Sequence, residues 1–305
     1  MSKVSKEDLS RLASQEDVED VLNYFEMFFS EHNEEIPDNT LRVEDRLDVD
    51  ICGNPGADCG TEEEAMLTAR AMLANLDFRN ANLPFLFNKY RHTSGLTPWE
   101  ADHTAIFQDE NQPEKNPDLA ALQLHHHQIM GVHSILRNIF SEEPNADACT
   151  GMLVADEVGL GKTLQACTVL AFLGELAMRQ KHAKPVPPII GTSSSLPGAH
   201  TLVSDSDVVA QRPYLKDQKN LPERPHLIIV PGTLLAQWEH ELKVVFKRNS
   251  VDIMTYGTTQ PQRQEFWSEH GVFQSSKQPK YLQIILASHS VRLSSLISFT
   301  GSEQF

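Results

Sequence analysis

The chain has 305 residues, of which 40% are hydrophobic and 22% charged, a composition typical of globular proteins and not of disordered or fibrous ones. No apolar run reaches the roughly 18 residues that a membrane helix needs, and Met1–Asp8 lacks the apolar segment of a secretory signal. We therefore expect no membrane partner and a cytosolic or nuclear location.

The net charge of -16 is concentrated in the first part of the chain. Residues 1–120 hold 10 Lys and Arg against 26 Asp and Glu, whereas residues 121–305 hold 16 of each. An acidic surface repels a nucleic-acid backbone, so the first part is expected to bind a protein partner and not DNA. The change in charge predicts a boundary near residue 120, between an acidic, partly helical N-terminal region (1–120) and a second domain (121–305).

The first predicted element is an amphipathic helix in the acidic region. Apolar residues recur at helical spacing from Leu9 to Phe29, after a capping pattern Ser5-x-x-Asp8. The four cysteines form no Cys-x-x-Cys pair, and no zinc site is expected. The other elements predicted here are a loop, a second helix and a linker, over residues 31–60, 61–76 and 108–118.

From Leu122 onward, strands and helices alternate. Helices are predicted over residues 122–140, 163–178 and 233–247, and strands over 151–155, 226–230, 251–256 and 281–287. Residues 181–225 are rich in Pro, Ser, Lys and Gln, which predicts a surface insertion. This alternation predicts an α/β fold, a mostly parallel sheet with helices on both faces.

The segment Asp156–Thr163, Asp-Glu-Val-Gly-Leu-Gly-Lys-Thr, lies between a predicted strand and a predicted helix. Polyphosphates bind to backbone N–H groups beside a helix N-terminus, and glycines let the backbone come close. Gly159 and Gly161 supply that freedom. Lys162 can reach the β- and γ-phosphates, and Thr163 can offer its hydroxyl to Mg²⁺. The segment therefore predicts a site for ATP and Mg²⁺; the alternative is a chance glycine-rich turn.

This segment resembles motif I of the Snf2 family, a branch of the superfamily 2 helicase-like, DNA-dependent ATPases. Residues 124–132 resemble the family's Q-motif, residues 226–241 its motif Ia and, more weakly, residues 282–291 its motif Ib. The resemblance covers about residues 122–292 and implies a P-loop, RecA-like first lobe. It implies catalytic roles for Lys162 and Thr163. The residues that the resemblance implies bind ATP are Gln128, Asp156, Glu157, Val158, Gly159, Leu160, Gly161, Lys162 and Thr163.

Gln128 falls where the Q-motif glutamine reads the edge of adenine. An amide can donate to and accept from adenine at once, which suits this role. The alternative is an exposed polar residue on a helix. A metal site at His125–His127 is not expected, because adjacent positions do not share a helix face.

The motif Ia stretch predicts contacts with the DNA backbone. A strand ends at Pro231 and a helix begins near Thr233, so free N–H groups and the Thr233 hydroxyl can hold a phosphate without reading bases. Ser288, in the stretch that resembles motif Ib, is a further candidate. The implied partner is double-stranded DNA or chromatin, bound through its backbone.

The resemblance implies a translocase of chromatin remodelling or DNA repair in the nucleus. A full family member continues with an acidic Mg²⁺-binding motif and a second lobe with arginine fingers. The sequence as given ends at Phe305 without them, so we expect a partial lobe, from a truncated product, that does not hydrolyse ATP alone. The alternatives are a nucleotide-binding or protein-interaction module without hydrolysis, and another P-loop enzyme. A GTPase would need Asn-Lys-x-Asp, and Asn88–Arg91 lacks the Asp.

Overall fold

The computed structural model divides into two compact units, each built from stretches that lie far apart in the sequence. Unit 1 comprises Met1–Tyr24, Tyr90–Ala120 and Glu223–Phe305, and unit 2 comprises Phe25–Lys89 and Ala121–Pro222. The structure describes residues 9, 11–31, 63–100, 103–107, 115–140, 152–190 and 221–289. Most of the predicted loop 31–60 and most of the predicted insertion 181–225 lie outside these ranges.

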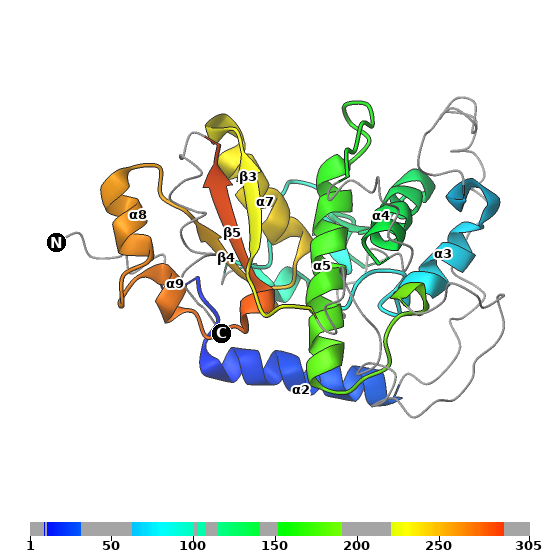
Figure 1. Ribbon diagram of the computed structural model, residues 1–305, viewed down its shortest axis with the longest axis horizontal. Coiled ribbons are helices and arrows are strands. Elements are labelled where there is room, and N and C mark those ends of the chain that lie inside the picture. The colour runs from blue at the N-terminus through cyan, green and yellow to red at the C-terminus, as the bar shows by residue number, and fades with distance from the viewer. Residues whose placement is uncertain are drawn as a thin grey trace, which may run out of the picture. The chain divides into compact units, whose positions relative to one another are not determined.

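The centre of unit 1 is a three-stranded parallel sheet (Figure 1). Its strands are β3 (His226–Val230), β4 (Asp252–Thr255) and β5 (Gln283–Ser288), in the order β3-β5-β4. Every residue of β5 is buried, as expected for the middle strand of a parallel sheet. The strands confirm those predicted over residues 226–230, 251–256 and 281–287.

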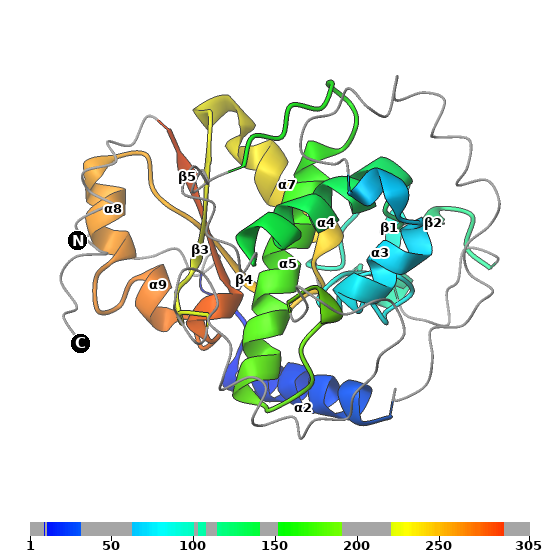
Figure 2. The same cartoon turned by 45° about the vertical axis from the view of Figure 1, so that its right-hand side comes forward.

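Helices cover both faces of this sheet. Helix α7 (Leu235–Val245) follows the 3-10 turn η5 (Gly232–Leu234), confirms the helix predicted over 233–247, and packs against β4 and β5 (Figure 2). Helices α8 (Gln260–Phe266) and α9 (Val272–Ser275) supply Phe266 and Phe273 to a cluster with strand residues of the opposite face. The strand residues of that cluster are Met254, Ile285 and Ala287. Unit 1 therefore has the layered α/β architecture that the alternating pattern predicts.

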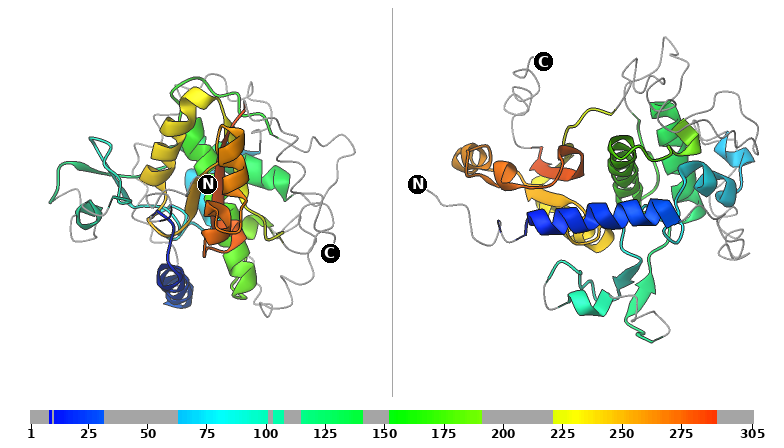
Figure 3. Two further views of the ribbon diagram at one scale, coloured as in Figure 1. Left: turned by 90° about the vertical axis from the view of Figure 1, so that its left-hand side faces the viewer. Right: turned by 90° about the horizontal axis from the view of Figure 1, so that it is seen from below.

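Unit 1 also holds the short strand β1 (Tyr90–His92), paired in a two-stranded sheet with β2 (Leu119–Ala121), whose last residue is assigned to unit 2. Figure 3 shows this pair in blue-green, together with the 3-10 turn η3 (Thr104–Phe107). Helix α2 (Gln15–Glu31) confirms most of the helix predicted near the N-terminus but begins later, because residues 11–14 are not helical and Ser14 Oγ accepts from Asp17 N at 3.1 Å. The predicted capping residues Ser5 and Asp8 lie outside the described residues. The helix begins in unit 1 and ends in unit 2. No helix in the described ranges is long and apolar enough to cross a membrane.

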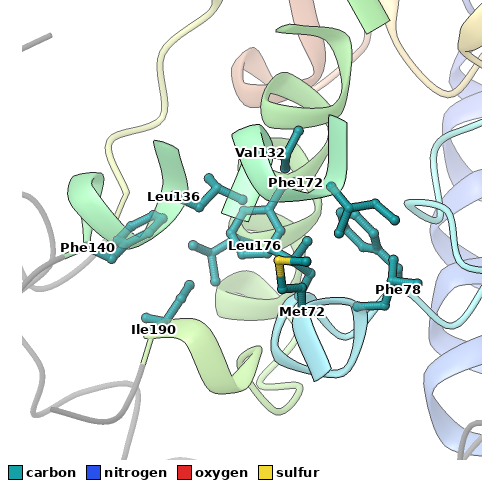
Figure 4. Packing of buried hydrophobic residues seen from close by; sticks show 11 residues of the cluster. Met72, Phe78, Val132, Leu136, Phe140, Phe172, Leu176 and Ile190 are labelled. Carbon is teal, nitrogen blue, oxygen red and sulfur yellow. The ribbon is translucent and has the colours of Figure 1, made fainter. Parts of the chain in front are cut away.

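In the part of unit 2 that the structure describes, three helices share one apolar core. The helices are α3 (Ala69–Leu76), α4 (His126–Ile139) and α5 (Lys162–Lys181), and α4 packs against both of the others. Its core is formed by side chains from all three helices, among them Met72, Val132, Leu136, Phe172 and Leu176 (Figure 4). Cys167 of α5 is also fully buried. Helices α4 and α5 confirm the predictions over 122–140 and 163–178.

A buried polar network anchors α4 to the preceding segment. Glu64, in the 3-10 turn η2 (Glu64–Met66), accepts hydrogen bonds from His133 Nδ1 at 2.9 Å and Arg137 Nε at 2.9 Å. Asn75 Nδ2 of α3 lies 3.2 Å from His133 Nε2, an arrangement that fits an Nδ1–H tautomer. Burial alone would raise the pKa of Glu64, but the His133 and Arg137 hydrogen bonds and the Arg137 charge lower it to about 2. The network therefore holds α4 through a buried carboxylate.

The buried strand predicted over residues 151–155 is wrong for the part that the structure describes. Residues 152–155 form no strand, and Leu153 is 89% exposed. An apolar run becomes a strand only if a neighbouring strand satisfies its backbone groups, and no described strand pairs with this segment. The chain therefore enters the glycine-rich loop from an unpaired segment.

Candidate nucleotide-binding site

The glycine-rich loop lies in unit 2 and ends where α5 begins. Gly159 has φ +96° and Gly161 has φ +79°, in the region that favours glycine. A Cβ atom at Gly159 would meet no atom within 4 Å, whereas one at Gly161 would lie 2.2 Å from Gln128 Nε2. Gly159 thus leaves the backbone open to a ligand, and Gly161 leaves room for a side chain of α4.

Lys162, the first residue of α5, folds its side chain back over the loop. Its Nζ atom donates to the main-chain oxygens of Asp156 at 2.7 Å and Glu157 at 2.8 Å. An ammonium group has three donors, so these bonds leave one for a phosphate oxygen. The structure therefore holds a positive charge at the loop without an ion pair to a carboxylate of any described residue.

The N-terminus of α5 has the features of an anion site. Gly161 is its N-cap residue and has no side chain to satisfy the first N–H groups, and no acidic residue lies in the first turn. Unsatisfied N–H groups and the helix dipole both favour an anion at this end. Thr163 lies in this first turn, with its side chain partly exposed. A phosphate at the loop would have N–H donors, the Lys162 ammonium and the Thr163 hydroxyl within one helical turn.

Two side chains from the start of α4 contact the far end of the loop. Gln128 Nε2 donates to Leu160 O at 3.1 Å, and His127 Nε2 donates to the same oxygen at 3.0 Å. The Gln128 Oε1 atom accepts from His125 N at 2.9 Å, in a capping box. Gln128 is buried, and both ends of its amide are bonded within the protein. To read adenine, as the sequence predicts, this amide would have to exchange or share these bonds.

Asp156, the first loop residue, is held by a residue that sequence reasoning missed. Gln165 Nε2 of α5 donates to Asp156 Oδ2 at 2.6 Å. The only signal in the sequence is that Asp156 stands where the general phosphate-loop pattern has glycine, so its carboxylate needs a partner. The loop is therefore fixed at both ends, at Asp156 from α5 and at Leu160 from α4.

The predicted DNA-contacting residues lie in unit 1, at the carboxyl edge of the parallel sheet. Val230 and Ser288 are register partners at the ends of β3 and β5. Pro231 and Thr233 are exposed at this edge. Ser288, in contrast, is only 2% exposed, and a Cβ atom at Gly232 would lie 3.2 Å from its hydroxyl oxygen. The edge thus presents Pro231 and Thr233 to solvent, above a buried Ser288.

The fold and the loop together are consistent with the RecA-like class of α/β ATPases. The model of the SNF2-related domain matches residues 32–296, and the chain belongs to this family. Members of the family are DNA-dependent, helicase-like ATPases that generally use ATP with Mg²⁺.

A curated relative points in the same direction. The chain is 29% identical over 111 residues to the DNA repair protein rad5 of Neurospora crassa. The match covers 35% of this chain and 8% of that protein. The chain therefore spans a small part of the length of this relative.

Proposed function

We propose that the chain is the ATP-binding part of a Snf2-type DNA-dependent ATPase, which moves along duplex DNA during DNA repair or chromatin remodelling in the nucleus. The observation that carries this proposal is the Lys162 ammonium, held at an open glycine backbone and at an uncapped helix N-terminus. Membership of the SNF2 family and the similarity to a DNA repair protein support it.

In this proposal the loop binds the triphosphate through its own backbone. The N–H groups around Gly159 and the first turn of α5 surround the phosphates, and Lys162, held by the carbonyls of Asp156 and Glu157, directs its remaining N–H donor to the β- and γ-phosphates. Thr163 contributes its hydroxyl to the shell of Mg²⁺. When bound, ATP with Mg²⁺ would supply the phosphoryl group whose transfer drives the ATP-dependent activity of the family. Gln128 orients the base, and DNA phosphates bind at Pro231 and Thr233.

A titration with a fluorescent ATP analogue tests the proposal. Lys162→Ala removes a charge-assisted contact worth about 1.5–3 kcal/mol, so affinity should fall about ten- to a hundredfold. Lys181→Ala, in the last turn of the same helix, is the matched control and should bind as the unaltered chain does. Equal affinity of the Lys162→Ala variant and the unaltered chain would show that the loop is not a phosphate site.

A further inference from the structure

We propose that Gln165 is a positioning residue of the phosphate loop, which sets the place of Lys162 by holding Asp156. The inference rests on the proposed function, because it assigns Gln165 a role in the ATP site of that proposal. Gln165 itself would touch neither nucleotide nor metal. It lies on α5, three residues after Lys162, and its side chain is 1% exposed.

Two glutamine–glycine contacts join α4 to the loop and α5. Gln128 of α4 lies against Gly161, where a Cβ atom would come within 2.2 Å of its Nε2 atom. Gln165 of α5 lies against Gly131 of α4, where a Cβ atom would come within 2.4 Å of its Oε1 atom. Each glutamine thus occupies space that only a glycine on the other segment leaves open. Each also donates to the loop, Gln128 to Leu160 O and Gln165 to Asp156 Oδ2.

Gln165 acts on Lys162 through a single residue. Asp156 accepts from Gln165 with its side chain and from Lys162 Nζ with its main-chain oxygen. Fixing the carboxylate fixes the peptide plane beside it, and this plane directs the ammonium of Lys162. Loss of the Gln165 contact would free the first loop residue and the cation together.

Burial of the Gln165 amide is unfavourable in a way that burial of an apolar side chain would not be. Its Oε1 atom has no hydrogen-bond partner among the described residues. A methionine of similar length would fill the space without leaving a buried acceptor unsatisfied. The amide is therefore explained by its bond to Asp156 and not by the packing of α4 on α5.

The experiment reverses the polarity of the Asp156–Gln165 hydrogen bond in the full chain. Q165E places two carboxylates side by side, so affinity for a fluorescent ATP analogue should fall at least about tenfold, and amides of residues 157–161 should exchange faster with deuterium. In D156N/Q165E the introduced amide donates to the introduced carboxylate. Affinity and exchange should return to within about threefold of the unaltered chain. A purely structural role for Gln165 would give no such rescue.

Q180E is the matched control, because Gln180 lies near the other end of α5 and accepts from Leu221 N through an oxygen that glutamate retains. It should change neither measurement. If Q165E does not fold, Q165M carries the test and should show the same losses. Unchanged affinity and exchange in Q165E or Q165M, or a double variant no better than Q165E, would overturn the inference. If the unaltered chain binds no ATP, the proposed function fails, and the exchange measurements without nucleotide still decide the role of Gln165.

Discussion

At the scale of single residues, the two loop glycines meet different structural requirements. Both have positive φ, but only Gly161 faces a side chain, that of Gln128. A substitution at Gly159 therefore strains the backbone alone, whereas one at Gly161 also displaces Gln128. The same backbone angle thus has two different reasons within one loop.

We predict that Gly161→Ala and Gly159→Ala both weaken ATP binding, through backbone strain of about 1–2 kcal/mol. Gly161→Ala should lose more, because the new methyl group collides with Gln128 Nε2. Because Gln128→Ala itself should weaken binding, each double variant is compared with Gln128→Ala alone: in that background Gly161→Ala should cost less than in the unaltered chain, and Gly159→Ala should cost the same. Titration of the three single and two double variants checks this prediction. Equal recovery at both positions would contradict it.

At the scale of elements, Glu64 joins the turn η2 to helix α4. Its pKa is lowered to about 2 from the ordinary glutamate value of 4.5. A carboxyl with a lowered pKa in the folded state stabilises the fold above its unfolded pKa, and this contribution disappears as the pH falls through the folded pKa. A shift of this size corresponds to about 3 kcal/mol.

We predict that the free energy of unfolding falls as the pH drops from about 4.5 to about 2, and that Glu64→Gln removes this part of the dependence. Asp252 of unit 1 has the opposite effect on the pH dependence of the free energy of unfolding, because burial raises its pKa. The difference between the unaltered chain and the variant therefore isolates Glu64. Urea denaturation at a series of pH values measures it, and parallel curves for the two chains would refute the assignment.

The carboxyl edge of the sheet gives a prediction about DNA. Thr233→Ala should weaken binding to duplex DNA about two- to tenfold, because one hydroxyl contact with a phosphate is lost. Ser288→Ala should have a smaller effect, since the Ser288 side chain is buried. Binding should not depend on base sequence and should weaken as salt rises. Anisotropy titrations with two unrelated duplexes at several salt concentrations test this, and strong discrimination between the duplexes would count against a backbone site.

The longer helices and the strands of the parallel sheet could be predicted from the sequence because their signals are local. Spacing of apolar residues located α4, α5, β3, β4 and β5, but not the short strands β1 and β2 or the short helices α8 and α9. It failed at residues 152–155, because an apolar run alone does not tell whether a neighbouring strand is present. The bonds of Gln165 to Asp156 and of Glu64 to His133 were also missed. Such contacts join separate elements, and no local pattern encodes them.

At the scale of the whole molecule, the assignment to the SNF2 family covers most of the chain, residues 32–296. Family activity requires more than a phosphate loop. Phosphoryl transfer needs the metal held from two sides and the developing charge neutralised. No Asp-Glu-x-His segment follows the loop in the printed sequence. ATP binding by this chain therefore does not imply ATP hydrolysis, and the two must be measured separately.

We predict that the 305-residue chain binds ATP but releases phosphate far more slowly than the about 1 s⁻¹ typical of enzymes. In the proposed site Thr163 would hold Mg²⁺ from one side only, and an arginine finger is worth about 10³–10⁵ in rate. Steady-state phosphate release with and without duplex DNA measures this, beside Lys162→Ala as a contamination control. DNA-stimulated turnover near 1 s⁻¹ that is lost in the variant would mean that these residues contain an unrecognised catalytic carboxylate.

Cys167 lies on α5, one turn beyond Thr163, and is buried. The rate at which its thiol is alkylated can therefore be used to measure nucleotide binding at the start of this helix. A thiol with no exposed surface reacts with an alkylating reagent only when the helix opens. A nucleotide that binds only the closed form slows alkylation by the factor 1 + [L]/Kd. With Cys52, Cys59 and Cys149 replaced by serine, the alkylation rate at increasing ATP would thus yield a dissociation constant for unlabelled nucleotide. The same measurement without ATP would give the stability of the helix on which the phosphate loop depends.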